Sequence, residues 1–277
     1  MKVWASGRYI SGRDGASSAM NRTSPLTPTI STSSGPRAQQ VLSRLPSAAA
    51  ALPNSRRAKA SLTMVTGVVV IVSNGVNPRP PSNGIRFINR GTLHIEDTVI
   101  RRFNAANSAG ISVAVTAASK LFINNVTVAE NGNLATGGGI VIAPGVGGSI
   151  RGSMTNSRVR NNANNGLRMD STNGAITMVI QQSDFSGNAT GISLQAGQTI
   201  NAMLTDSIVS NNSVAGITGN GPAFLRTGNT SITGNTLGVQ ASGGAQLLTY
   251  GNNRLLQNPS SGVANNGNFI GVALGTQ

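Results

Sequence analysis

The amino-acid sequence predicts an all-β fold, a right-handed parallel β-helix solenoid of about seven to eight coils of roughly 22–29 residues each. A basic leader that we expect to be largely disordered precedes it. Three observations predict this fold. A motif recurs from about residue 84 onward, apolar and polar residues alternate around it, and aromatic residues make up only 3% of the 277 residues. With so few aromatic residues, the interior must be narrow and filled by aliphatic and small hydroxyl side chains.

The repeated motif begins with an Asn, Asp or Gln, here called the starter. The starters are Asp97, Asn125, Asn156, Gln182, Asp206, Asn229 and Asn252. A small residue usually follows at once, an apolar residue stands three positions later, and an Asn stands six positions later in all copies but the first, which has Phe103. Each copy also has a Gly followed by an aliphatic residue, at Gly84, Gly110, Gly139, Gly166, Gly191, Gly216, Gly238 and Gly262. The spacing of these glycines drifts between 22 and 29 residues, which is typical of a solenoid.

Each period supplies three short strands. The first follows the Gly, as in Ile192 and Leu194, which alternation places on one face. The second strand has its inward residues four and two positions before the starter, which in the last copy are Leu248 and Tyr250. The third has them one and three positions after it.

This change of parity predicts a bend at the starter, where Asn and Asp tolerate left-handed backbone angles. We therefore expect the starters to form a structural corner ladder, each amide donating to its neighbour one coil away. The inward small residues should form a hydroxyl stack; they are Thr98, Ser157, Ser183, Ser207 and Thr230.

The chain divides into a leader, residues 1–66, and a repeat domain, residues 67–277. The leader is rich in Ser, Pro, Ala and Arg and carries nine Lys or Arg against one acid, Asp14. Such a composition predicts disorder, and the change in composition is also consistent with a wrongly assigned start or reading frame. A short helix over Ala38–Leu45 is the only candidate cap for the first coil, and Val68–Val72 is the predicted first strand. No signal peptide and no membrane span are recognisable.

The copies at Asn156–Asn162, with Gly166-Leu167, and at Asp206–Ile217 resemble those of right-handed parallel β-helix proteins of the pectate-lyase-like superfamily. The resemblance covers residues 84–277, and 67–277 with the first strand. It implies a secreted or cell-envelope bacterial protein. The superfamily contains polysaccharide lyases, glycoside hydrolases and members without assigned chemistry, so the resemblance specifies the fold better than the activity.

Residues for catalysis are not recognisable in the repeat domain. By the resemblance, a lyase would hold calcium with clustered carboxylates, and a hydrolase would need two acids at a defined separation. The acids of the repeat domain are scattered: Glu96, Asp97, Glu130, Asp170, Asp184 and Asp206. The single histidine, His94, has no carboxylate partner beyond Glu96, and there is no cysteine. We therefore predict no catalytic residues, no metal and no cofactor, which favours a non-enzymatic role.

The predicted function is that of a non-catalytic extracellular or cell-envelope protein that binds glycans or serves as a surface scaffold. The alternative is a polysaccharide lyase or glycoside hydrolase with a cryptic or degenerate site. The candidate glycan-binding face is the polar side of the first sheet, with Arg168, Asp170, Ser193, Gln195, Thr218, Asn220 and Gln240. The competing interpretation is that these are solvated strand residues, because the face lacks aromatics. We expect polysaccharide as the partner, no specific nucleic-acid binding, and self-association through the open solenoid ends.

Overall fold

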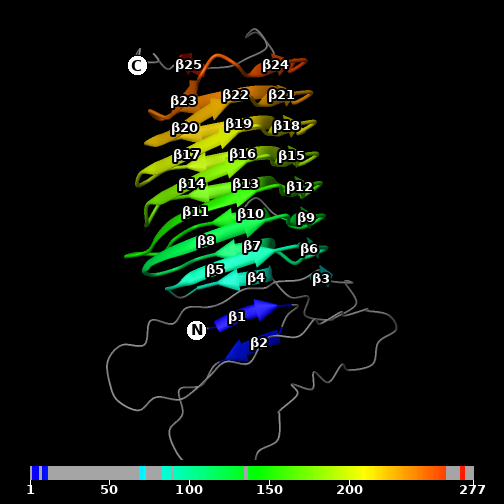
Figure 1. The fold of residues 1–277 in the computed structure, drawn as a ribbon, viewed down its shortest axis with the longest axis vertical. Coiled ribbons are helices and arrows are strands. Elements are labelled where there is room, and N and C mark those ends of the chain that lie inside the picture. The colour runs from blue at the N-terminus through cyan, green and yellow to red at the C-terminus, as the bar shows by residue number, and fades with distance from the viewer. Residues whose placement is uncertain are drawn as a thin grey trace, which may run out of the picture.

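The computed structural model describes the backbone of residues 2–5, 8–11, 69–72, 83–88, 90–133, 137–259 and 269–271. Side chains are described for 83–88, 90–133 and 137–259. These residues form a parallel β-solenoid of about seven coils whose walls are three sheets, with no helix among them (Figure 1). The predicted all-β solenoid is confirmed.

The three sheets are called A, B and C. Sheet A contains β1 (Lys2–Ala5), β2 (Arg8–Ser11), β4 (Asn83–Phe87), β7 (Ala109–Val113), β10 (Gly138–Ile142), β13 (Asn165–Asp170), β16 (Thr190–Gln195), β19 (Ala215–Asn220) and β22 (Leu237–Ser242). Sheet B contains β5 (Thr92–Glu96), β8 (Ala118–Asn124), β11 (Ser149–Thr155), β14 (Ile176–Gln181), β17 (Ile200–Thr205), β20 (Ala223–Gly228), β23 (Gln246–Thr249) and β25 (Phe269–Gly271). Sheet C contains β3 (Val69–Val72), β6 (Thr98–Arg101), β9 (Thr127–Ala129), β12 (Arg158–Arg160), β15 (Asp184–Ser186), β18 (Ile208–Ser210), β21 (Ser231–Thr233) and β24 (Arg254–Leu256).

Each coil runs through sheets A, B and C in turn, and each strand pairs in parallel with the equivalent strand one coil later. Leu167 pairs with Ile192, and Val159 pairs with Phe185. This register stacks inward residues on inward residues, so the aliphatic side chains form one continuous core along the solenoid axis. Strand β14 shows the underlying pattern, because its buried and exposed residues alternate strictly.

The starters form the corner between sheets B and C. Asp97, Asn125, Asn156, Gln182, Asp206 and Asn229 have φ between 47° and 53°. The predicted left-handed bend is present at these six positions. In the last coil, Gly251 takes the left-handed conformation (φ 85°) instead of Asn252.

A second left-handed corner, which the sequence analysis did not predict, lies five positions after each starter. Its residues have φ between 53° and 67° and are Arg102, Glu130, Asn161, Gly187, Asn211, Gly234 and Gln257. It turns the chain out of sheet C and directs the next side chain into the core.

The next side chain is the Asn six positions after the starter, and these residues form the buried asparagine ladder: Asn131, Asn162, Asn188, Asn212, Asn235 and Asn258. Each is at most 2% exposed. Between neighbours, the Nδ2 of one Asn donates to the Oδ1 of the next at 2.8–3.3 Å. Each Nδ2 also donates to a backbone carbonyl of the preceding coil, as from Asn188 to Val159. The continuous ladder therefore runs six positions after the starters and not through them.

The starters themselves are exposed or half-exposed, and their side chains pair only in places. Asn125 Nδ2 donates to Asp97 Oδ1 (2.7 Å), and Asn229 Nδ2 donates to Asp206 Oδ1 (2.6 Å). Within the described residues, Gln182 makes no such bond. The coils are joined here mainly by the backbone, because the N–H groups of the first five starters each donate to a backbone carbonyl of the next coil. The N–H of Asn229 donates instead to the side-chain Oδ1 of Asn252 (2.8 Å). A left-handed corner directs its side chain outward, where water satisfies it, so an unbroken amide ladder is not required.

The predicted hydroxyl stack lies next to this corner, inside the core. All five hydroxyl residues are at most 3% exposed. Ser183 is typical: its Oγ accepts from Ser157 N and donates to Gln181 O. The hydroxyls therefore bond to the backbone of their own coil and of the preceding coil, and not to one another.

The repeated glycines are explained by the asparagine ladder. A Cβ on Gly191 would lie 2.9 Å from Asn212 Nδ2 and 2.7 Å from Val209 Cγ1. A Cβ on Gly166 would lie 2.8 Å from Asn188 Nδ2. At these positions the first strand of a coil passes so close to the ladder asparagine of the same coil that only glycine fits.

The two ends of the solenoid differ from the repeat. Strand β3 confirms the predicted first strand, and β1 and β2 add to sheet A as an antiparallel pair next to β4. The rest of residues 1–66, including the predicted helix Ala38–Leu45, lies outside the described residues. In the last coil, Leu225 pairs with Leu247 and Ser231 with Arg254. One extra residue is therefore present before β24, and the predicted inward pair Leu248 and Tyr250 is wrong by one position.

Candidate functional site

The seven predicted glycan-binding residues lie on the outer face of sheet A, on four adjacent strands. They form two rows across β13, β16, β19 and β22. The first row is Arg168, Ser193, Thr218 and Gln240. The second is Asp170, Gln195 and Asn220, continued by Ser242. Because adjacent strands are about 4.8 Å apart, each row is a regular array of polar groups.

An ion pair closes one end of these rows. Arg168 Nη2 lies 2.7 Å from Asp170 Oδ2. The backbone N–H and the hydroxyl of Thr172 donate to Asp170 Oδ1 at 3.1 and 2.6 Å. Burial raises the pKa of Asp170, but the hydrogen bonds from Thr172 and Arg168 outweigh it and hold this pKa below its ordinary value of 3.8. The pair is therefore fixed and ionised at neutral pH.

The rest of the face is unevenly accessible. Ser193 is only 5% exposed and its Oγ accepts from Gln195 Nε2 at 3.4 Å, so it offers little surface to a ligand. Thr218 is half-buried, whereas Asn220 and Gln240 are exposed. Accessible amides and hydroxyls are therefore concentrated on β19 and β22.

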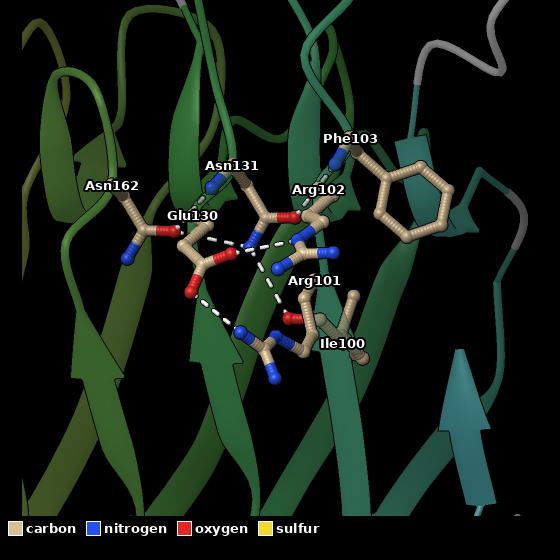
Figure 2. A network of polar contacts seen from close by, with 7 residues as sticks. All are labelled: Ile100, Arg101, Arg102, Phe103, Glu130, Asn131 and Asn162. Atoms are coloured by element: carbon tan, nitrogen blue, oxygen red, sulfur yellow. Dashed lines mark hydrogen bonds and ion pairs between the residues drawn. The ribbon is translucent and has the colours of Figure 1, made fainter. Parts of the chain in front are cut away.

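A second charged cluster joins two coils at the corner after sheet C (Figure 2). Glu130 accepts from Arg101 Nη2 at 2.5 Å and from Arg102 Nε at 2.9 Å. Hydrogen bonds from Arg102 and then Arg101 hold the pKa of Glu130 below its ordinary value of 4.5. The neighbouring Phe103 N donates to Asn131 Oδ1, where the asparagine ladder begins. Both carboxylate oxygens of Glu130 are thus occupied by arginines of the preceding coil, so the cluster stabilises the stacking of the two coils.

Carboxylates of the described residues do not gather into a catalytic or metal-binding group. Asp184 binds Arg160 on sheet C, and Asp97 and Asp206 occupy exposed corners. No group of three or more His, Asp or Glu residues able to hold a metal ion occurs within the described ranges. His94 stacks on Phe122, with ring centroids 4.8 Å apart and an interplanar angle of 26°.

The outer face of sheet B carries a feature that the sequence analysis missed. Lys120 on β8 and Arg151 on β11 pair in register and are both exposed. Phe122, stacked on His94, lies two residues further along β8. The two cations are 31 residues apart in the sequence, so the signal that finds them is the strand register and not a local motif.

Comparison with protein-family models, curated protein sequences and solved structures gives no match. In the portion of the chain that the structure describes, no helix has the length and apolarity needed to cross a membrane.

Proposed function

We propose that this chain is a non-catalytic β-helix protein of the cell envelope or extracellular space that binds a polysaccharide along the outer face of sheet A. The resemblance to the pectate-lyase-like superfamily, carried by the copies at Asn156 and Asp206, supports this placement. The contact surface is centred on β19 and β22, where Thr218, Asn220 and Gln240 are accessible.

The observation that carries the proposal is the pair of polar rows in register across four strands. A glycan presents hydroxyl groups that recur with each sugar, and the strand spacing of about 4.8 Å is comparable to the length of one hexose unit. Side chains with both donors and acceptors, such as Asn220 and Gln240, suit such a ligand. The fixed pair of Arg168 and Asp170 closes one end of the rows.

The non-catalytic role is supported by the distribution of the acids. Hydrolysis of a glycosidic bond needs an acid and a second carboxylate flanking the same bond. On this face Asp170 is bound by Arg168 and Thr172, and the positions beside it on β16 and β19 are Gln195 and Asn220. A carboxylate that already binds an arginine and a threonine is suited to positioning a ligand rather than to transferring a proton.

Affinity electrophoresis of the full chain in gels containing neutral and acidic polysaccharides tests the proposal. We expect one polysaccharide to retard the wild-type protein, and the double variant Asn220→Ala/Gln240→Ala to bind about fivefold more weakly, as two lost hydrogen bonds predict. Asn201→Ala, an exposed amide of sheet B, is the matched control. Reducing-sugar and unsaturated-product assays on the bound polysaccharide should find no product.

Two results would refute the proposal. Equal retardation of the double variant and the control would remove sheet A as the binding face. Release of product that depends on an acid of the repeat domain would favour the lyase or hydrolase alternative.

A further inference from the structure

The outer face of sheet B brings two cations together without an anion. Lys120 and Arg151 lie side by side on β8 and β11, and both are exposed. Among the described residues neither makes an ion pair, although four other arginines do. The nearest acid on this face of sheet B is Glu96 on β5. It lies four residues beyond Thr92, the register partner of Lys120, which is about 13 Å along the strand at 3.3 Å per residue. Like charges on adjacent strands destabilise a sheet, so an external anion would relieve this repulsion.

An apolar ring surface lies directly beside the two cations. Phe122 is two residues from Lys120, and its ring stacks on that of His94 with the centroids 4.8 Å apart. Both rings are half-exposed. The faces of aromatic rings are suited to the apolar face of a sugar ring, which the outer face of sheet A does not offer.

A free hydroxyl completes the surface. Ser153 pairs in register with Phe122 and lies two residues from Arg151. Its Oγ makes no hydrogen bond within the described residues and its side chain is half-exposed, so it can donate to and accept from a ligand hydroxyl. Gly152, between Arg151 and Ser153 on β11, lies so close to the carbonyl oxygen of Leu121 that no Cβ would fit. Strand β11 therefore packs tightly against β8 at this point.

We propose that this surface, formed by His94, Lys120, Phe122, Arg151 and Ser153, binds a sugar that carries a phosphate monoester. A phosphate monoester bears a charge of about −1.5 to −2 at neutral pH, which matches two adjacent cations, whereas a carboxylate neutralises only one. The phosphate lies between Lys120 and Arg151, and the sugar ring lies over Phe122 with a hydroxyl toward Ser153. Single-stranded nucleic acid would use successive aromatic platforms. On this face the stacked pair of His94 and Phe122 is separated by intervening strands from Phe224 on β20, so a phosphorylated glycan is the better fit. The surface is separate from that on sheet A, and neither proposal depends on the other.

Biolayer interferometry on an immobilised mannan that carries phosphate monoesters tests the proposal, with the same mannan after phosphatase treatment as the matched ligand. The full chain is used at 0.15 M salt, where the Debye length is about 8 Å and attraction between more distant charges is largely screened. We expect binding to the phosphorylated mannan to be on the order of tenfold tighter than to the treated mannan. Lys120→Gln/Arg151→Gln should weaken binding on the order of tenfold, as two exposed charge contacts predict. Phe122→Leu should weaken it about threefold.

Arg158→Gln/Arg254→Gln is the charge-matched control, because both residues are exposed arginines on sheet C. This control matters because basic residues in general bind polyanions without specificity, and residues 1–66 carry nine of them. Equal losses in the control and in Lys120→Gln/Arg151→Gln would overturn the proposal, as would undiminished binding to phosphatase-treated mannan. Tighter binding of a thymidine oligonucleotide at the same residues would also overturn it, in favour of nucleic acid. Asn220→Ala/Gln240→Ala should bind phosphorylated mannan normally, which separates this proposal from that for sheet A. Far-ultraviolet circular dichroism verifies the fold of every variant.

Discussion

Removal of one asparagine from the middle of the asparagine ladder should destabilise the solenoid more than any exposed change. In Asn188→Ala, the carbonyl of Val159 loses its donor (3.0 Å). The N–H and the side-chain amide of Asn162 lose their acceptor (3.0 Å each). Each buried group left without a partner costs about 1–3 kcal/mol. Water entering the vacated volume recovers part of this cost, so we expect a loss of about 3–5 kcal/mol.

The matched control is Asn156→Ala at an exposed starter. Its side chain donates only one long bond, 3.4 Å to Asn124 Oδ1, and its backbone is left-handed (φ 49°). Replacing Asn by Ala at a left-handed backbone conformation should lower the free energy of unfolding by about 1 kcal/mol. Guanidinium unfolding followed by circular dichroism gives both midpoints, with a common slope used for the free energies.

Because a stacked repeat can unfold in parts, hydrogen exchange of the Asn162 amide provides a local measurement. That amide donates to Asn188 Oδ1 and should exchange faster in Asn188→Ala. Equal midpoint shifts in the two variants, with unchanged exchange at Asn162, would show that the asparagine ladder does not hold the coils together.

Two more predictions follow from the same geometry. Gly191→Ala should lower the free energy of unfolding by about 2–3 kcal/mol, because the added Cβ would lie 2.7 Å from Val209 Cγ1. The control is Gly145→Ala, whose nearest contact would be 3.4 Å and which should change the melting temperature by about a degree or less. Equal shifts in melting temperature would contradict the close packing at Gly191. Glu130→Gln should lower the melting temperature above pH 4.5, because a depressed pKa stabilises the folded state above the ordinary value and this contribution is lost as the pH falls below it. Melting curves between pH 3 and 8 test this, and a difference that stays constant with pH would contradict it.

The sequence alone predicted the coil and its first corner, because both depend on local parity. The inward positions on either side of Asn156 change from even to odd offsets, and a left-handed residue is the physical means of that change. The starters vary among Asn, Asp and Gln, as an exposed left-handed corner allows. For that reason Asp97 and Gln182 occupy equivalent places.

The asparagine ladder was assigned to the wrong column because both columns are rich in Asn. The difference was present in the repeat: the six ladder positions are all Asn, whereas the starters are mixed. A buried amide that donates twice and accepts twice, as Asn188 does, cannot be replaced by a carboxylate without loss of both donors. The second corner was not predicted, although Asn or Gly, which favour left-handed angles, occupy it in four of the seven copies. The signal is obscured because Arg102, Glu130 and Gln257, at the equivalent place in the other copies, have no such preference.

The inward and outward positions of this solenoid report different properties of the protein. Every inward side chain packs against the equivalent residue of the next coil, so the copies resemble one another where they maintain the fold. Outward side chains meet solvent, and they are free to differ from coil to coil. Lys120 and Arg151 stand in a column whose other members are uncharged: Thr92, Thr177, Asn201, Phe224 and Gln246. Contacts that could bind a ligand form between coils, and their members lie more than twenty residues apart in the chain. Local spacing therefore cannot find these sites, whereas strand register can.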